Sequence, residues 1–292
     1  MSKLRPIEEK FTINKEHWVG NGFRVRNYFP GGRNLLERFS PFALMDYNAP
    51  RKFPPSESSR GIGRHPHRGI ETVTFAFQGA VEHHDNAGNH GIIYPGDVQW
   101  MTAGEGIMHK EYHEKEFLNK GGTFHMIQLW VNLPKKHKYV PARYQELSGN
   151  KMGKAGLAEG KGNVTVVSGE FQGVRGPAMT YSPMNIYLMD LEVGAKVTFN
   201  EPGDYNTGIL LTGGEAEVNS LSCTHKDFIL FENKQGEIVI ESKTRGTTLI
   251  VLSGEPLNEP AVAGGPFVMN TREELDKAFE DFRLGKFGTE EF

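Results

Sequence analysis

Residues 64–91 read RHPHRGIETVTFAFQGAVEHHDNAGNHG, and this stretch carries the pattern from which the fold is most directly predicted. Two histidines, His65 and His67, are separated by one residue and precede an apolar, β-branched run, Glu71–Phe77, that ends at the turn glycine Gly79. Such a run is typical of a β-strand. Side chains at positions i and i+2 of a strand point to the same face, so both imidazoles are expected to point the same way.

A second pair of ligand-type side chains, His109 and Glu111, has the same spacing further along the chain. If two strands bring the pairs to one point inside a barrel or sandwich, three imidazoles and a carboxylate form a mixed nitrogen and oxygen ligand set. Such a set suits a divalent first-row metal and leaves coordination positions open for substrate or oxygen. We therefore expect a single metal site formed by these four side chains.

Histidine is concentrated in the first half of the chain. All but two of the eleven histidines, His17 and His225, lie between His65 and His137. Several neighbours of the predicted ligands are expected to be hydrogen-bonded or solvated imidazoles: His83, His84, His90, His113 and His125. Because His125 lies in an apolar strand, it could also point inward and support a ligand. Imidazole chemistry is therefore expected only in the first half.

Composition indicates a globular protein, with 37% hydrophobic, 24% charged and 11% aromatic residues. A length of 292 residues exceeds what one hydrophobic core usually serves, so two domains are expected. A net charge of −3, without a lysine- or arginine-rich face, argues against general nucleic-acid binding. The sequence shows neither a membrane span nor the apolar core of a signal peptide, and the single cysteine, Cys223, suits a reducing compartment. We expect a cytoplasmic protein.

The secondary-structure pattern is predominantly β. Thirty-five glycines and sixteen prolines separate short segments that are rich in β-branched and aromatic residues. This pattern is expected for antiparallel barrels or jelly rolls. A glycine- and lysine-rich stretch, residues 148–162, predicts the connection between domains or a mobile loop beside it. We expect an all-β protein with an N-terminal domain of residues 1–140 and a C-terminal domain of residues 141–292.

One helix is predicted near the end of the chain. Thr271 and Glu274 have the spacing of a capping box, in which each side chain binds the other residue's backbone amide. Leu275, Phe279 and Phe282 follow at helical spacing and predict one apolar stripe packed against a sheet. Gly285 predicts the left-handed residue that ends the helix.

The two halves look like diverged copies of one unit. Residues 72–79 and residues 206–213 are both apolar strands that end at a turn glycine. Aligning them places Phe199 and Glu201 at the positions of His65 and His67, so the second copy is expected to keep the scaffold without the metal. Two unrelated β domains would give a similar signal.

Taken together, these motifs resemble the pirin family, a bicupin branch of the cupin superfamily. Besides residues 64–91, the matching segments are YPGDVQWMTAGEGIMHKE at 94–111, IQLWVNLP at 127–134, VVSGE at 166–170 and LSGEPLNEPAVAGGPFVMN at 252–270. The resemblance runs from about Val19 to about Lys286, with its most specific motifs in the first half. It implies two face-to-face antiparallel β-barrels of the jelly-roll type with a C-terminal helix, and a metal only in the N-terminal barrel.

The resemblance also assigns the ligands to His65, His67, His109 and Glu111. Cupins in general take their carboxylate ligand from the first motif, where this chain has Glu71, so Glu71 is an alternative to Glu111. Glu111 is preferred because it shares a strand face with His109. Pirins are associated with iron, which implies one Fe(II) per chain, although the ligand set itself also allows Mn, Co, Ni, Cu or Zn.

The family is linked to quercetin 2,3-dioxygenase activity, the cleavage of a flavonol ring by O2 with loss of CO. The implied partners are a small aromatic, flavonol-like substrate and O2, with Glu111 as the catalytic base that accepts the substrate's 3-hydroxyl proton. Some pirins are instead described as iron-dependent regulators that contact a transcription factor or a metabolic enzyme. A cupin isomerase and a purely structural metal site are further alternatives.

Overall fold

The computed structural model describes residues 3–288, which divide into two compact units. Unit 1 contains residues 3–13, 38–40 and 150–256, and unit 2 contains residues 14–37, 41–149 and 257–288. Each unit therefore includes a terminal segment from the other end of the chain, whereas the sequence predicted two continuous domains. The C-terminal helix in particular belongs to unit 2, together with the predicted metal ligands.

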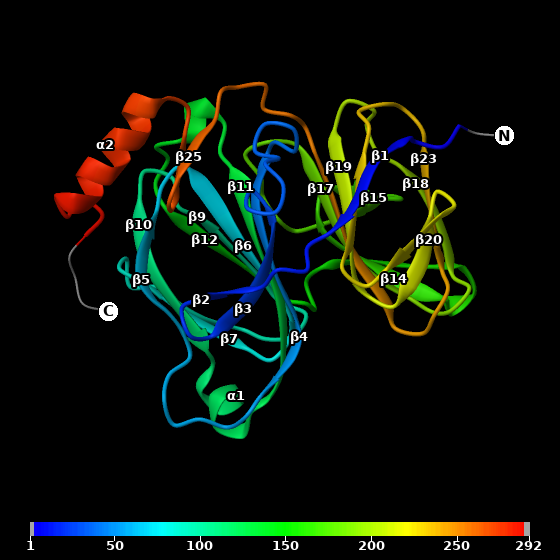
Figure 1. Ribbon diagram of the computed structural model, residues 1–292, viewed down its shortest axis with the longest axis horizontal. Coiled ribbons are helices and arrows are strands. Elements are labelled where there is room, and N and C mark those ends of the chain that lie inside the picture. The colour runs from blue at the N-terminus through cyan, green and yellow to red at the C-terminus, as the bar shows by residue number, and fades with distance from the viewer. Residues whose placement is uncertain (1–2, 289–292) are drawn as a thin grey trace. The chain divides into compact units, whose positions relative to one another are not determined.

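Unit 2 is built from two antiparallel sheets (Figure 1). Its seven-stranded sheet has the order β12-β9-β6-β11-β4-β3-β2. The strands of this sheet are β2 (His17–Val19), β3 (Phe23–Phe29), β4 (Phe42–Phe53), β6 (Ile70–Gln78), β9 (Val98–Thr102), β11 (Gly122–Asn132) and β12 (Arg143–Leu147). The four-stranded sheet has the order β5-β10-β7-β8. Its strands are β5 (Gly61–His67), β7 (Val81–Asp85), β8 (His90–Ile93) and β10 (Ile107–His113).

Unit 1 repeats this plan with two antiparallel sheets of the same sizes. The seven-stranded sheet has the order β1-β22-β19-β24-β17-β14-β13. Its strands are β1 (Ile7–Thr12), β13 (Gly153–Gly156), β14 (Gly162–Ser168), β17 (Met184–Leu191), β19 (Asn206–Gly213), β22 (Asp227–Phe231) and β24 (Thr247–Gly254). The four-stranded sheet has the order β18-β23-β20-β21. Its strands are β18 (Lys196–Asn200), β20 (Glu215–Val218), β21 (Leu221–Thr224) and β23 (Glu237–Ser242).

The strand orders of the two units correspond position by position, which confirms the predicted internal repeat. β6 and β19 are both third in the order of their seven-stranded sheets, and β5 corresponds to β18. One edge differs in origin. In unit 2 the edge strand β12 follows the other strands in the chain, whereas in unit 1 the same edge is β1, from the N-terminal segment. Figure 1 shows this blue strand among the yellow strands of unit 1.

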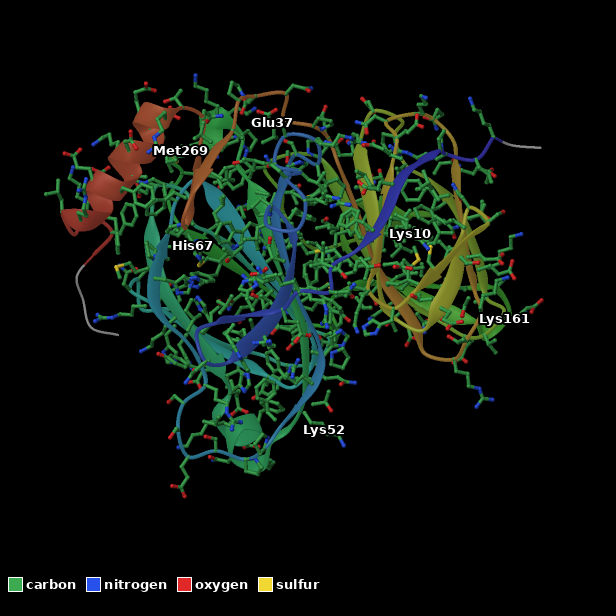
Figure 2. The ribbon with its side chains drawn as sticks, in the orientation of Figure 1. Lys10, Glu37, Lys52, His67, Lys161 and Met269 are labelled. Carbon is green, nitrogen blue, oxygen red and sulfur yellow. The ribbon has the colours of Figure 1, made fainter. Side chains whose placement is uncertain are left out.

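The hydrophobic core of each unit lies between its two sheets, and side chains fill this space (Figure 2). In unit 1, Ile209 and Val251 of the larger sheet pack with Ile238 and Ile240 of the smaller sheet. Burial of each such aliphatic side chain stabilises the fold by about 1.5–3 kcal/mol. The central strand β6 is buried over most of its length, as expected for a continuous β-branched and aromatic run.

In unit 1, apolar side chains stand at the positions of His65, His109 and Glu111, and the buried Glu201 stands at the position of His67. Phe199 pairs across β18 and β23 with Ile238, as His65 pairs across β5 and β10 with His109. Ile240 then stands at the position of Glu111, and it is fully buried. Among residues 3–288, both groups of three side chains that could hold a metal lie in unit 2. The structure thus shows the same scaffold with a different interior.

The C-terminal segment of unit 2 contains β25 (Val262–Gly264), β26 (Phe267–Met269) and α2 (Arg272–Arg283). The predicted capping box between Thr271 and Glu274 is confirmed, and Gly285 has the left-handed φ of 70°. Of the predicted apolar stripe, Phe282 is 36% exposed, although its ring still lies against those of Phe267 and Phe287. Its neighbour Asp281 is buried, and it forms an ion pair with Arg68.

The remaining elements are short. They are α1 (Lys115–Lys120), the 3-10 turns Lys135–His137 and Ala158–Gly160, and the ribbon of β15 (Glu170–Phe171) and β16 (Val174–Arg175). The helices within residues 3–288 are all too short or too polar to cross a membrane. Loops and turns, rather than helices, therefore connect most strands. The predicted ligands lie on two of these strands, β5 and β10.

Candidate metal centre

The predicted ligands lie on neighbouring strands, β5 and β10, of the four-stranded sheet. The register places His65 opposite His109 and His67 opposite Ile107. Burial alternates along β10, so that His109 and Glu111 are buried while the intervening Lys110 is half-buried. The strand alternation expected from the sequence is therefore present, and it directs both side chains to the interior of unit 2.

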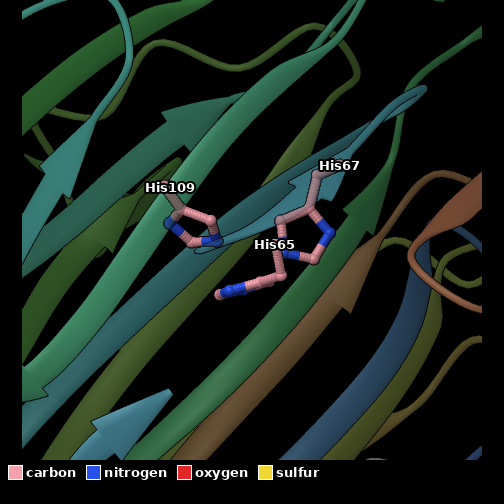
Figure 3. A group of neighbouring side chains, drawn as sticks. All are labelled: His65, His67 and His109. Carbon is pink, nitrogen blue, oxygen red and sulfur yellow. The ribbon is translucent and has the colours of Figure 1, made fainter. Parts of the chain in front are cut away.

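The three imidazoles face one another (Figure 3). The ring centroid of His109 is 4.2 Å from that of His65 and 4.9 Å from that of His67, and the last two centroids are 5.0 Å apart. One ring nitrogen from each lies within 4.8 Å of the others. Ligand atoms that bind one metal at about 2.1 Å lie roughly 3–4 Å apart. The three side chains are thus close enough to share one ion.

Backbone carbonyls fix the orientation of the two histidines on β5. The Nδ1 atom of His65 lies 2.8 Å from the carbonyl oxygen of Gly63, and Nδ1 of His67 lies 3.2 Å from that of Pro266. A carbonyl oxygen only accepts, so Nδ1 carries the proton in both rings and donates it. The Nε2 lone pairs are then available to a metal. Hydrogen bonds of this kind commonly orient the imidazole ligands of metal sites.

The ring of His109 is also held through its Nδ1 atom, in this case by another histidine, His83. Its Nδ1 atom lies 3.0 Å from Nε2 of His83, and the Tyr144 hydroxyl lies 3.2 Å from the same His83 nitrogen. Nε2 of His109 is buried and has no hydrogen-bond partner. An unsatisfied buried polar atom costs about 1–3 kcal/mol. A metal ion bound at this nitrogen would remove that cost, so the residues present fit a metal.

Burial also keeps these imidazoles in the form that binds metals. It lowers the pKa of His67 and of His109 well below the ordinary 6.5, and the neighbouring imidazoles lower it further. Burial lowers the pKa of His65 as well, against the opposing effect of the Gly63 carbonyl. Neutral imidazoles present a free nitrogen lone pair, so metal binding need not compete with a proton.

The two candidate carboxylates lie on different sheets. Glu111 is buried on β10, and burial raises its pKa to about 7 against the opposing effect of the Thr74 hydroxyl. Glu71 is buried on β6, and its carboxylate accepts a hydrogen bond of 2.7 Å from the hydroxyl of Thr102. Neither carboxylate belongs to the group of ligand atoms that lie within 4.8 Å of one another. The assignment of Glu111 as fourth ligand stays a prediction.

The other histidines of the region are hydrogen-bonded, as expected. His113 lies 2.9 Å from the carbonyl oxygen of Gly22, and His125 lies 3.1 Å from the Tyr47 hydroxyl. The contact of His83 with His109 was not anticipated from the sequence. Strand alternation places His83 in the interior on the same face as the apolar Val81, and this spacing was the only signal for its burial that the sequence of β7 offered.

The C-terminal segment supports the end of β5, beside His67. Arg68 donates to Asp281 of α2 at 2.9 Å and to the backbone oxygen of Glu105 at 2.6 Å. Nζ of Lys138 donates to the backbone oxygens of Gly69 and Val268, each at 2.7 Å. The helix was assigned only a packing role from the sequence, but its segment also supplies the carbonyl of Pro266 that orients His67.

Known proteins match both halves of the chain. The sequence profile described as Pirin matches residues 22–131, and the profile described as Pirin C-terminal cupin domain matches residues 186–288. The chain belongs to the pirin family. A Pseudomonas aeruginosa pirin relative, named provisionally as a quercetin 2,3-dioxygenase, is 44% identical over 271 residues, or 93% of this chain and 94% of the relative. Human pirin is 34% identical over 285 residues, which are 96% of this chain and 93% of the human protein.

A solved structure agrees with this placement in the pirin family. The crystal structure titled as quercetin 2,3-dioxygenase from Acinetobacter baumannii has a TM-score of 0.94 and 41% sequence identity. The match covers 98% of this chain and 99% of that chain. The all-β bicupin fold expected from the sequence is confirmed. Together with the three convergent histidines, the family places this chain among the metal-binding cupins.

Proposed function

We propose that the chain is an oxygenase of the quercetin 2,3-dioxygenase type, which uses O2 to open the ring of a small flavonol-like substrate. We further propose that His65, His67, His109 and Glu111 hold one Fe(II). The observation that carries this proposal is the convergence of three imidazoles whose Nδ1 atoms are all hydrogen-bonded to the protein. The names of the P. aeruginosa relative and of the A. baumannii structure support the choice of reaction.

The donor set suits this chemistry. Three imidazoles and one carboxylate would leave positions open at a six-coordinate metal. When bound, the metal would supply Lewis-acid and one-electron chemistry, with room for a flavonol oxygen and for O2. The chain's own residues hold the imidazoles in one orientation and keep them neutral. His67 and His109 are buried, whereas His65 is half-buried and lies on the more accessible side of the group.

Glu111 is assigned two tasks in this proposal. As a ligand it adds negative charge to the three neutral imidazoles, and as a base it accepts the proton of the substrate's 3-hydroxyl group. Its position supports both tasks, because it is buried on the same strand face as His109. It also lies opposite His83 in the register of β10 and β7. The proton transfer therefore depends on a carboxylate that water reaches poorly.

Glu111→Gln tests the base. An amide keeps the shape of the side chain but does not accept the proton, so turnover should fall by about 10²–10⁴-fold while much of the metal is retained. Metal content and quercetin consumption are measured on the same iron-loaded preparation, together with release of CO. Glu71→Gln is the matched control, because Glu71 is the other buried carboxylate considered as a ligand. The control should keep both metal and turnover.

Three results would change the assignment. A parallel loss of metal and turnover in Glu111→Gln would make Glu111 a ligand only. Loss of metal in Glu71→Gln would move the carboxylate ligand to the other sheet. If the fully metallated wild-type protein consumes no quercetin, the enzyme assignment for this substrate is overturned. An iron-dependent binding protein that contacts a transcription factor or a metabolic enzyme would then be the better interpretation.

A further inference from the structure

A second group of ligand-type side chains lies on the hairpin formed by β7 and β8. The group consists of Glu82, His84 and His90. On β7, Glu82 and His84 alternate with the buried Val81, His83 and Asp85, so they point to the opposite face of the strand from His83. His84 and His90 are direct cross-strand partners in this antiparallel pair.

The ligand atoms of this group are already close together. The carboxylate oxygen Oε1 of Glu82 lies 3.0 Å from Nε2 of His84 and 3.0 Å from Nε2 of His90. The two imidazole centroids are 4.3 Å apart. A metal at about 2.1 Å from two ligands, with a right angle between them, separates those ligands by roughly 3.0 Å. The three side chains could therefore bind a metal with little change in their positions.

The turn between the two strands is held in place by Asp85. Its carboxylate accepts hydrogen bonds from the backbone N–H of Ala87 and of Asn89, both at 2.8 Å, and from the Asn89 side chain at 2.7 Å. His90 directly follows this turn, so its position relative to His84 is fixed before any ion binds. Such preorganisation lowers the conformational entropy lost on binding.

We propose that Glu82, His84 and His90 form a second, exposed metal site for a borderline divalent cation such as Zn²⁺, Ni²⁺ or Cu²⁺. Two imidazoles and one carboxylate are a donor set that these cations accept, and water would complete the coordination. The three side chains are between 27% and 49% exposed, which gives the ion and its water ligands access. Each imidazole would bind through Nε2, with its proton moving to Nδ1.

This site is weaker than the buried histidine group. Lys110 lies opposite His84 in the register of β10 and β7, and its positive charge opposes a bound cation. Water also screens a charge at an exposed position. The group does not share a residue with the buried one, so the proposal is independent of the proposed oxygenase function.

Equilibrium dialysis against Zn²⁺, followed by metal analysis, tests the second site. Wild-type protein should bind one more ion per chain than the double variant His84→Ala/His90→Ala. His17→Ala is the matched control, because His17 is an exposed histidine of the same unit outside both groups. This control should bind as many ions as the wild type. Equal stoichiometry in the wild type and the double variant overturns the proposal.

A milder variant guards against a folding defect in the double variant. Glu82→Gln leaves both imidazoles in place and removes only the charged ligand. The affinity of this variant for the more weakly bound Zn²⁺ ion should fall by at least about tenfold, since one of three protein ligands is replaced by a poor donor. Far-ultraviolet circular dichroism checks that the strands are intact. An unchanged affinity in this variant would show that the ion binds elsewhere and would also overturn the proposal.

Discussion

A metal site depends on the direction in which each imidazole presents its free nitrogen, and here three different acceptors set that direction. Two are backbone carbonyls, of Gly63 and Pro266, and the third is the side chain of His83. A side-chain acceptor can be replaced by mutation, whereas a carbonyl cannot. His83 is therefore the position at which the orientation of a ligand is open to experiment.

His83→Phe should weaken metal binding. The change leaves Nδ1 of His109 without its acceptor, so the ring loses its fixed orientation, and affinity should fall by about 10–100-fold. His83→Gln is the matched control, because its amide oxygen is able to accept the same hydrogen bond, and it should retain more of the affinity. Competition with a coloured chelator gives the affinities. Equal losses in both variants would show that the hydrogen bond from His109 to His83 does not set the affinity.

The four positions proposed as ligands could be singled out from the sequence, because i and i+2 spacing on a strand is a local property. The contact between His83 and His109 was not, since it depends on which strands pair and in which register. Burial of Glu71 and of Glu111 is similarly a property of the assembled sheets. Sequence therefore identified the candidate donors and left open how close each lies to the others.

Secondary-structure elements meet at the end of β5, where the ion pair of Arg68 with Asp281 connects the ligand strand to α2. Both side chains are 8% exposed, so neither charge is well solvated. Hydrogen bonds from Lys286 and Arg68 hold the pKa of Asp281 far below its ordinary value. The capped helix itself was predicted from local signals, but the partner of its buried acid lies more than two hundred residues away.

Asp281→Asn should destabilise the protein. The buried Arg68 would lose its counter-charge, and breaking a buried pair in this way costs about 3–5 kcal/mol. Lys277 and Lys286 pair with the same carboxylate and would lose that contact as well. Asp276→Asn is the matched control on the same helix, because its pair with Arg272 is largely exposed and contributes about 0–1 kcal/mol. Urea unfolding measures the free energy of unfolding of both variants and of the wild type. Equal effects would contradict a special role for the buried pair.

At the scale of the whole molecule, one strand plan is used twice with different interiors. The unit with histidines in its ligand strands has a candidate metal centre, and the other has Phe199, Ile238 and Ile240 at corresponding positions. The repeat was visible in the sequence as a pair of similar strands. The exchange of terminal segments was not, because strand periodicity predicts that a strand exists and not which sheet it joins.

Unit 1 has a buried acid, Glu201, at the position that corresponds to His67. The stability of the protein should therefore depend on pH. Burial raises the pKa of Glu201, opposed chiefly by a hydrogen bond from Asn185. Above the ordinary pKa of 4.5 the folded chain therefore holds a proton that the unfolded chain has lost, so stability falls as pH rises through this range. Glu201→Gln removes this dependence.

The comparison needs thermal unfolding at several pH values. The thermal midpoint of Glu201→Gln should rise relative to that of the wild type as the pH increases above the ordinary glutamate pKa of 4.5, as the linkage between proton binding and folding requires. Glu192→Gln, at an exposed glutamate of the same unit, is the matched control and should follow the wild type. A difference between Glu201→Gln and the wild type that does not change with pH would refute the linkage.

The exchange of terminal segments constrains the order in which a growing chain is able to fold. β1 is synthesised before the other strands of unit 1, yet the strand with which it pairs, β22, follows more than two hundred residues later. Conversely, all the predicted metal ligands precede residue 112, whereas Pro266, which orients His67, is synthesised 199 residues after it. A nascent chain can therefore assemble most strands of unit 2 early, but the histidine group is fully oriented only after Pro266 has been synthesised.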